Sequence, residues 1–241
     1  MTEPALDLDA SVGRADPDRW LASRFVSDAQ ARADLIALYA FDIELARALS
    51  VASEPMMAEI RLTWWAEALD EIFEGRKVRA HPVAQALAEA VARRGLKRGP
   101  LDSLIDTRMQ EAYRPPFADE GTLFVHIDGL SGALMQAAAS LLSGQDVQLG
   151  AVQDAGRAWG LARAGRQIDP ERMPASLTPE RMRSMVRQSV RAGRKAMGQL
   201  PVAAFPAIAY TTFARPYSKG RDLTALEKQM RLVWATARGI L

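Results

Sequence analysis

The feature that most constrains the fold is a succession of apolar residues at helical spacing along nearly the whole chain. Ala, Leu, Arg, Glu and Met dominate, and β-branched runs that alternate with polar residues are absent. Pro and Gly mark the places where helices begin and end, as at Pro82 and Gly95. The pattern predicts an all-α chain of about nine helices.

These helices are expected to form a single domain over residues 1–241. The connections are short, except residues 166–180, which carry three prolines. That segment joins an acidic body to residues 181–241, which we interpret as the last layer of the same domain. Residues 1–17 are predicted to be flexible.

Charge is distributed unevenly. Residues 181–241 hold 12 Lys and Arg against 2 Asp and Glu, which leaves 19 basic and 27 acidic residues elsewhere. The basic end predicts either an anionic partner, such as a membrane surface, a diphosphate or an acidic protein, or a solvated face docked on the acidic body. The basic residues lie without interleaved aromatic residues, so nucleic acid is not expected as a partner.

Several classes of chemistry are excluded by composition. The chain has no cysteine, which removes disulfides, thiolate nucleophiles and iron–sulfur clusters and favours a reducing compartment. It shows no secretory signal and no long apolar run, so we expect a cytoplasmic protein, with peripheral attachment to the inner membrane as an open possibility. The only histidines, His81 and His126, lie in no recognisable catalytic motif, and no catalytic residue is predicted.

Small residues recur every four positions in two predicted helices. This spacing either lets backbones approach closely or leaves room for a ligand in a central cavity. The rows are Gly129, Ala133 and Ala137, and Gly156, Gly160 and Ala164.

Two tryptophans stand side by side in "AEIRLTWWAEALDEIF" (58–73). Adjacent residues point about 100° apart on a helix, so the pair cannot sandwich one ligand. The spacing predicts Trp64 in the core row of the helix with Ile60, and Trp65 in the neighbouring row with Leu69.

Four segments, in order, resemble the squalene/phytoene synthase family. They are "LIALYAFDIELARAL" (35–49), "EIRLTWWAEALDEIFEG" (59–75), "HPVAQAL" (81–87) and "GRAWGLARAGRQ" (156–167). The resemblance covers most of 18–180 and implies the all-α isoprenoid (terpenoid) synthase fold around a central cavity. Active members of the family couple two prenyl diphosphates head to head, with Mg²⁺ held by two aspartate-rich motifs.

The places of these motifs depart from the family pattern. Ala46, Arg47 and Ser50 stand where the first set of metal-binding aspartates is expected. Arg163 replaces a usual Asn of the second motif, and Gln167 stands where an Asp is expected. The pattern "YAF-x-x-ELAR" is instead similar to a degenerate branch that includes the mitochondrial respiratory complex I assembly factor and its bacterial relatives.

Three functions are compatible with this pattern. The first is a non-catalytic binding or respiratory-complex-assembly protein without metal or cofactor, bound to a protein partner. The second is an active Mg²⁺-dependent prenyltransferase with a relocated metal site, for which Asp42, Glu44, Asp169 and Glu171 are the available carboxylates. The third is a carrier that holds an apolar or prenyl ligand, a lipid or a quinone, in the cavity.

Arginines near the former metal positions have two interpretations. Arg47 and Arg163, assisted by Arg166, could bind a phosphate or carboxylate directly. Alternatively, Arg47 and Arg163 could form ion pairs between helices, with Glu44 or Asp154 as partners. The candidate binding residues are therefore Asp42, Glu44, Arg47, Arg163, Arg166, Gln167, Asp169 and Glu171.

Overall fold

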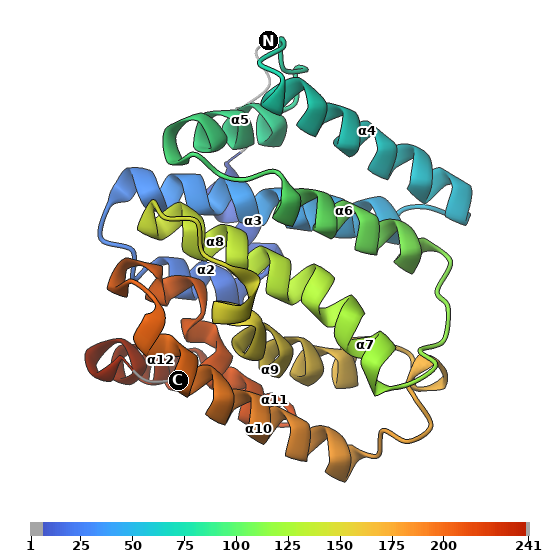
Figure 1. Cartoon of the computed structure of the whole chain (residues 1–241), viewed down its shortest axis with the longest axis vertical. Helices are drawn as coiled ribbons and strands as arrows, with labels where there is room; N and C mark the ends of the chain where they lie inside the picture. The colour runs from blue at the N-terminus through green and yellow to red at the C-terminus, as the bar shows by residue number, and fades with distance from the viewer. Residues whose placement is uncertain (1–6, 240–241) are drawn as a thin grey trace.

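The computed structural model describes residues 7–239, and within them the chain is helical and contains no strand. The all-α prediction is confirmed, with twelve α-helices instead of about nine. Figure 1 shows the helices stacked from α4 and α5 at one end to α10 at the other. The helices are α1 (Leu8–Ala15), α2 (Pro17–Ser23), α3 (Ala29–Ser50), α4 (Pro55–Phe73), α5 (Pro82–Arg94), α6 (Gly99–Ala112), α7 (Glu120–Ile127), α8 (Ala133–Ser143), α9 (Leu149–Gln167), α10 (Pro179–Ala196), α11 (Ala214–Tyr217) and α12 (Ala225–Arg238).

The first two helices were not expected from the sequence. Asp7 and Asp16 cap α1 and α2 through their side chains, and Val12 of α1 is completely buried against the core. The predicted flexibility of residues 1–17 is therefore wrong for residues 8–17, where two short helices carry too few residues to show a period. Residues 1–6 lie outside the described part of the chain.

Helix α3 is the centre of the bundle. Asp28 caps it by accepting a hydrogen bond from the Gln30 N–H at 2.9 Å. Every residue from Asp34 to Asp42 is buried, because α1, α5, α6 and α8 all pack around this helix. A helix covered on so many sides is apolar nearly all round, as the sequence indicates.

The rows of small residues mark a close approach of two backbones. A Cβ atom added to Gly156 of α9 would lie 2.9 Å from the Cα atom of Gly132, at the end of the π-helical turn Asp128–Gly132 that separates α7 from α8. A Cβ atom on Gly160 would lie 2.3 Å from Cγ2 of Ile127. Of the two interpretations, close packing applies at these glycines.

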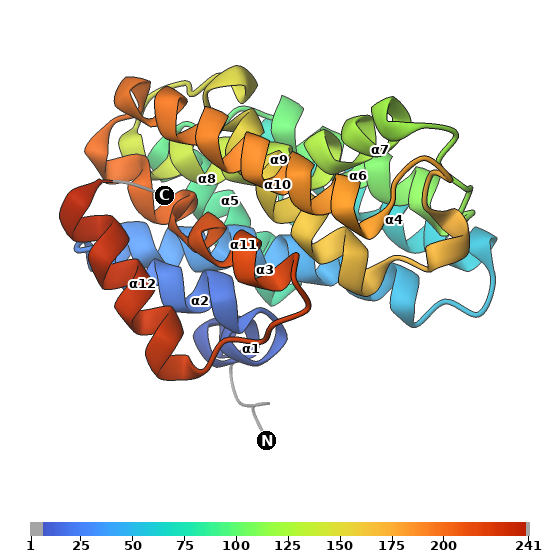
Figure 2. The same ribbon diagram turned by 90° about the horizontal axis from the view of Figure 1, so that it is seen from below.

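The C-terminal segment returns across the bundle. Residues 201–214 form two 3₁₀ helices, Val202–Ala207 and Ala209–Phe213, instead of one α-helix, because Pro206 lacks the N–H that an α-helix requires. In Figure 2, α10 runs along α9, and α12 lies beside α2. None of the helices between residues 7 and 239 has the length and the apolar character needed to cross a bilayer.

The two adjacent tryptophans are oriented differently from the prediction, because Trp65 is the one that is buried. Trp65 is 5% exposed and packs edge-on against Phe41 of α3 at 5.4 Å between ring centroids. Trp64 is 36% exposed and Ile60 is 57% exposed, so the assignment of these two residues to the core row is wrong. Helix α4 is apolar on both sides, and only packing decides which side is buried.

Candidate functional site

A cleft of about 480 Å³ opens between α2, α3, α6 and α9. Helix α3 contributes Arg47 and Ser50 to its wall, and α9 contributes Arg163 and Gln167. The structure thus brings together residues 46–50 and 163–167, where the two aspartate-rich motifs of active family members are expected. We call this site the arginine cleft, because Arg19, Arg47, Arg108, Arg163 and Arg172 all line it.

Arg19 of α2 forms the buried centre of the arginine cleft. Its Nη1 donates hydrogen bonds to Oδ2 of Asp16 at 3.0 Å and to Oδ2 of Asp42 at 2.9 Å. The guanidinium lies between the rings of Tyr39 and Tyr210, with centroids at 5.9 and 5.7 Å. All three charged side chains are only 8% exposed, so they form a desolvated ion-pair triad.

Two further arginines hold the same carboxylates. Nη1 of Arg163 donates to Oδ2 of Asp16 at 3.0 Å, and Nη2 of Arg108 lies 3.5 Å from Oδ1 of Asp42. Burial alone would raise the pKa of Asp16, but the charges of Arg19 and Arg163 outweigh burial and hold this pKa below its ordinary value. Asp16 is therefore ionised at neutral pH and forms ion pairs with two arginines.

Arg47 and Arg163 both form ion pairs. Arg47 lies 3.7 Å from Glu44 one turn away on the same helix, so this pair does not join two helices as the predicted one would. Arg163 pairs with Asp16 instead of Asp154, and its Nε also donates to Oε1 of Gln167 at 3.2 Å.

The remaining candidates lie away from the arginine cleft. Arg166 forms an ion pair with Asp222, beyond α11. Asp169 caps the exposed 3₁₀ turn Pro170–Arg172, and Glu171 lies within that turn. These carboxylates do not join Asp42 in one site.

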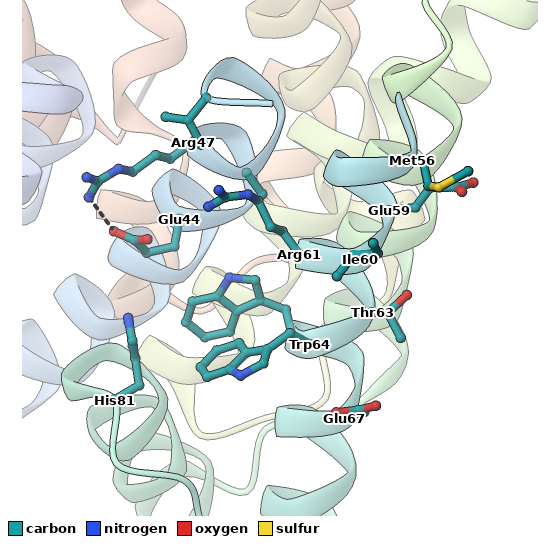
Figure 3. Close-up of a pocket in the computed structure, with 13 residues that line it drawn as sticks. Glu44, Arg47, Met56, Glu59, Ile60, Arg61, Thr63, Trp64, Glu67 and His81 are labelled. Atoms are coloured by element: carbon teal, nitrogen blue, oxygen red, sulfur yellow. Dashed lines mark ion pairs between the residues drawn. The ribbon is translucent and has the colours of Figure 1, made fainter. Parts of the chain in front are cut away.

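A second hollow, of about 910 Å³, lies between the end of α3 and α4. Figure 3 shows Arg61 and Trp64 on the side of α4 that faces Glu44. The ring of Trp64 stands perpendicular to that of Trp65, with centroids 4.9 Å apart. We call this hollow the α4 groove; Arg47 lines both the groove and the arginine cleft.

The sequence pattern of a known family matches residues 12–177, which is more than half of the chain; the family is squalene/phytoene synthase. The chain belongs to the squalene/phytoene synthase family. No curated protein sequence matches the chain.

Solved structures agree with this family in fold. A dehydrosqualene synthase solved with a ligand is 13% identical, with a TM-score of 0.79 over 96% of this chain and 94% of that chain. The squalene synthase HpnC from Alicyclobacillus acidocaldarius is 14% identical, with a TM-score of 0.69 over 97% and 93%. YisP from Bacillus subtilis subsp. subtilis strain 168 is also 14% identical, with a TM-score of 0.67 over 95% and 94%. These similarities show the isoprenoid synthase fold.

Active squalene/phytoene synthases use Mg²⁺, so we asked whether the side chains of the arginine cleft could coordinate this ion. Mg²⁺ requires carboxylate oxygens that are free to coordinate it. The carboxylates that line the cleft are Asp16, Asp42 and Glu111, and each has an arginine partner. Among residues 7–239, no three His, Asp or Glu side chains are grouped so that they could hold a metal ion. The side chains of the cleft therefore do not fit Mg²⁺.

Several residues of the arginine cleft were not found by sequence reasoning. Asp16 and Arg19 precede the four segments quoted for the resemblance, and their other partners, Arg163 and Asp42, are distant in the chain. Arg108 did carry a signal, because it occupies the apolar face of α6 beside Leu104 and Ile105, where an arginine requires a buried partner.

Proposed function

We propose that this member of the squalene/phytoene synthase family is non-catalytic and acts by binding, as in the branch that resembles the respiratory complex I assembly factor and its bacterial relatives. One observation carries the proposal: the carboxylates of the arginine cleft form ion pairs with arginines. Asp42, the carboxylate of α3 that lines the cleft, is bound by Arg19 at 2.9 Å and approached by Arg108 at 3.5 Å.

Recruitment of Asp42 by a metal would be energetically unfavourable. The ion would have to separate Asp42 from Arg19, whose side chain is 8% exposed. Arg19 would keep its ion pair with Asp16, so the cost would be the loss of one of its two buried contacts. Arg47 and Arg163 would add electrostatic repulsion of a divalent cation.

Turnover assays test this proposal. The full-length protein is incubated with Mg²⁺ and farnesyl or geranylgeranyl diphosphate, next to an active squalene synthase as the positive control. We expect the positive control alone to consume the diphosphate. A head-to-head condensation product that forms in proportion to the amount of this protein would overturn the proposal.

Binding of an apolar ligand is a second candidate, favoured by the α4 groove. Ile60 and Met56 of its wall are 57% and 66% exposed, and Trp64 adds an aromatic surface. Native mass spectrometry of freshly purified protein tests this function. A retained lipid or quinone that is lost in an Ile60→Glu variant supports it, and a bare protein mass argues against it.

A further inference from the structure

The outward face of α12 is apolar. Leu232 and Ala235 point into the core and are completely buried. On the opposite side of the helix, Leu226, Met230 and Val233 are 65%, 63% and 57% exposed. Their spacing of four and three places them in one stripe. A helix that packs on a core by one side normally presents polar residues on the other, so this stripe marks a candidate interaction surface.

An aromatic residue borders the stripe. Trp234 is 47% exposed, and the guanidinium of Arg238 lies 4.9 Å from the centroid of its ring. Tryptophan combines a large apolar ring with a polar N–H, a combination suited to the boundary between a bilayer and water. We call Leu226, Met230, Val233 and Trp234 the α12 face.

Arginines gather next to the α12 face. A hollow of about 420 Å³ separates α12 from α10 and α11, and Arg194, Arg215 and Arg231 line it together with Met230 and Trp234. Glu227 also lines this hollow and forms an ion pair with Arg221. The arginines come from three different helices, so the fold itself concentrates positive charge at this edge. Two more arginines, at positions 187 and 191 of α10, extend the charge along the surface.

Positive charge outweighs negative charge around Arg187, Arg191 and Arg215. Within residues 7–239, Arg187 and Arg191 form no ion pair, and Nε of Arg215 is buried without a hydrogen-bond partner. Burial lowers the pKa of Arg215, and the charges of Arg194 and Arg191 lower it further. A cluster of like charges is destabilised by its own repulsion, and bound anions would relieve that repulsion.

We infer that the α12 face docks on an anionic lipid bilayer, with its apolar side chains in the interface and the arginines of α10, α11 and α12 on lipid phosphates. Charge complementarity favours this partner over a neutral apolar one. The comparable exposed stripe on α4 is bordered by Glu59 and Glu67 as well as by Arg47 and Arg61, so acidic side chains offset the arginines there. Figure 1 shows α4 and α10 at opposite ends of the bundle, so the α4 groove lies far from the arginines of α10.

Vesicle co-sedimentation of the full-length protein tests the inference. The vesicles contain either phosphatidylcholine alone or phosphatidylcholine mixed with phosphatidylglycerol. We expect binding to the mixed vesicles only, weakened by added salt. In the double variant Arg187→Gln/Arg191→Gln, affinity should fall roughly 30-fold, since each basic residue near an anionic surface contributes about 1 kcal/mol.

Matched controls separate docking from general charge. Lys77→Gln/Lys97→Gln removes two exposed charges from the loops that flank α5 and should leave vesicle binding unchanged. Trp234→Ser should weaken binding at low and high salt alike, because it removes the apolar part of the contact. Circular dichroism checks that each variant is folded.

Four results would overturn the inference. The first three are equal binding to both kinds of vesicle, equal losses in the α10 and α5 double variants, and an acidic polypeptide that binds the arginine cluster more tightly than vesicles do. A dimer that forms through the α12 face and excludes vesicles would also contradict it.

Discussion

Arg19 holds the arginine cleft together at the scale of single residues. It is the shared partner of Asp16 and Asp42, and all three side chains are nearly excluded from water. We predict that Arg19→Met lowers the free energy of unfolding by about 3–5 kcal/mol, because it leaves buried carboxylates without their main partner. Urea denaturation measures the loss.

Arg47→Met is the matched control for that variant. The Arg47 side chain is 68% exposed and its ion pair with Glu44 spans 3.7 Å. Its replacement should change stability by no more than about 0.5 kcal/mol. Similar losses in both variants would show that the triad does not stabilise the cleft.

Asp16 makes the stability of the triad dependent on pH. Its pKa in the folded protein is below the ordinary value of 3.8, so the unfolded chain takes up a proton at higher pH than the folded one. The stabilisation that ionised Asp16 provides is fully present above pH 3.8, the ordinary pKa. It is lost as the pH falls through the lower pKa of the folded protein. We therefore predict that the stability difference between wild type and Asp16→Asn shrinks in acid. Urea denaturation at several pH values measures this stability difference. A difference that grows as the pH falls would contradict the lowered pKa of Asp16.

At the scale of secondary-structure elements, the position of α9 depends on close packing. Gly156 faces the backbone of Gly132, and a methyl group there would lie 2.9 Å from a Cα atom that cannot rotate away. We predict that Gly156→Ala destabilises the protein by about 1–3 kcal/mol in thermal or urea unfolding. Gly150→Ala, in the first turn of the same helix, meets nothing within 4 Å and should be neutral or stabilise by about 0.4–1 kcal/mol. Equal effects of the two changes would refute the close contact.

Elements with local signals could be predicted from the sequence. Residues 82–94 were expected as a helix and form α5, because Pro82 opens it and Gly95 ends it with a φ of 63°. The buried side of α4 could not be predicted, since Ile60 and Trp64 are as apolar as the residues that pack. The arginine cleft was predicted in part: Arg47, Arg163 and Gln167 were found through the resemblance. Asp16 lies 147 positions from Arg163, and no local pattern indicates a contact over that distance.

At the scale of the whole molecule, the surfaces for which we propose binding lie in different regions of the fold. The α4 groove and the arginine cleft share Arg47, whereas the α12 face lies beside the basic cluster of α10. The basic C-terminal helices are attached to the rest of the bundle by ion pairs, such as Lys228 with Asp18 at 2.6 Å and Arg181 with Glu120 at 2.9 Å. The proposed non-catalytic role and the proposed membrane docking thus concern different regions and can be tested separately.

Calorimetric titration of inorganic diphosphate, with and without Mg²⁺, tests most directly whether the arginine cleft has exchanged metal chemistry for binding. Any affinity for the anion would come from arginines such as Arg47 and Arg163, because the carboxylates of the cleft are already paired. We predict that Mg²⁺ leaves diphosphate binding unchanged or weakens it by competing for the anion. Binding that appears only when Mg²⁺ is added, and is lost in Asp42→Asn, would contradict the proposed non-catalytic function.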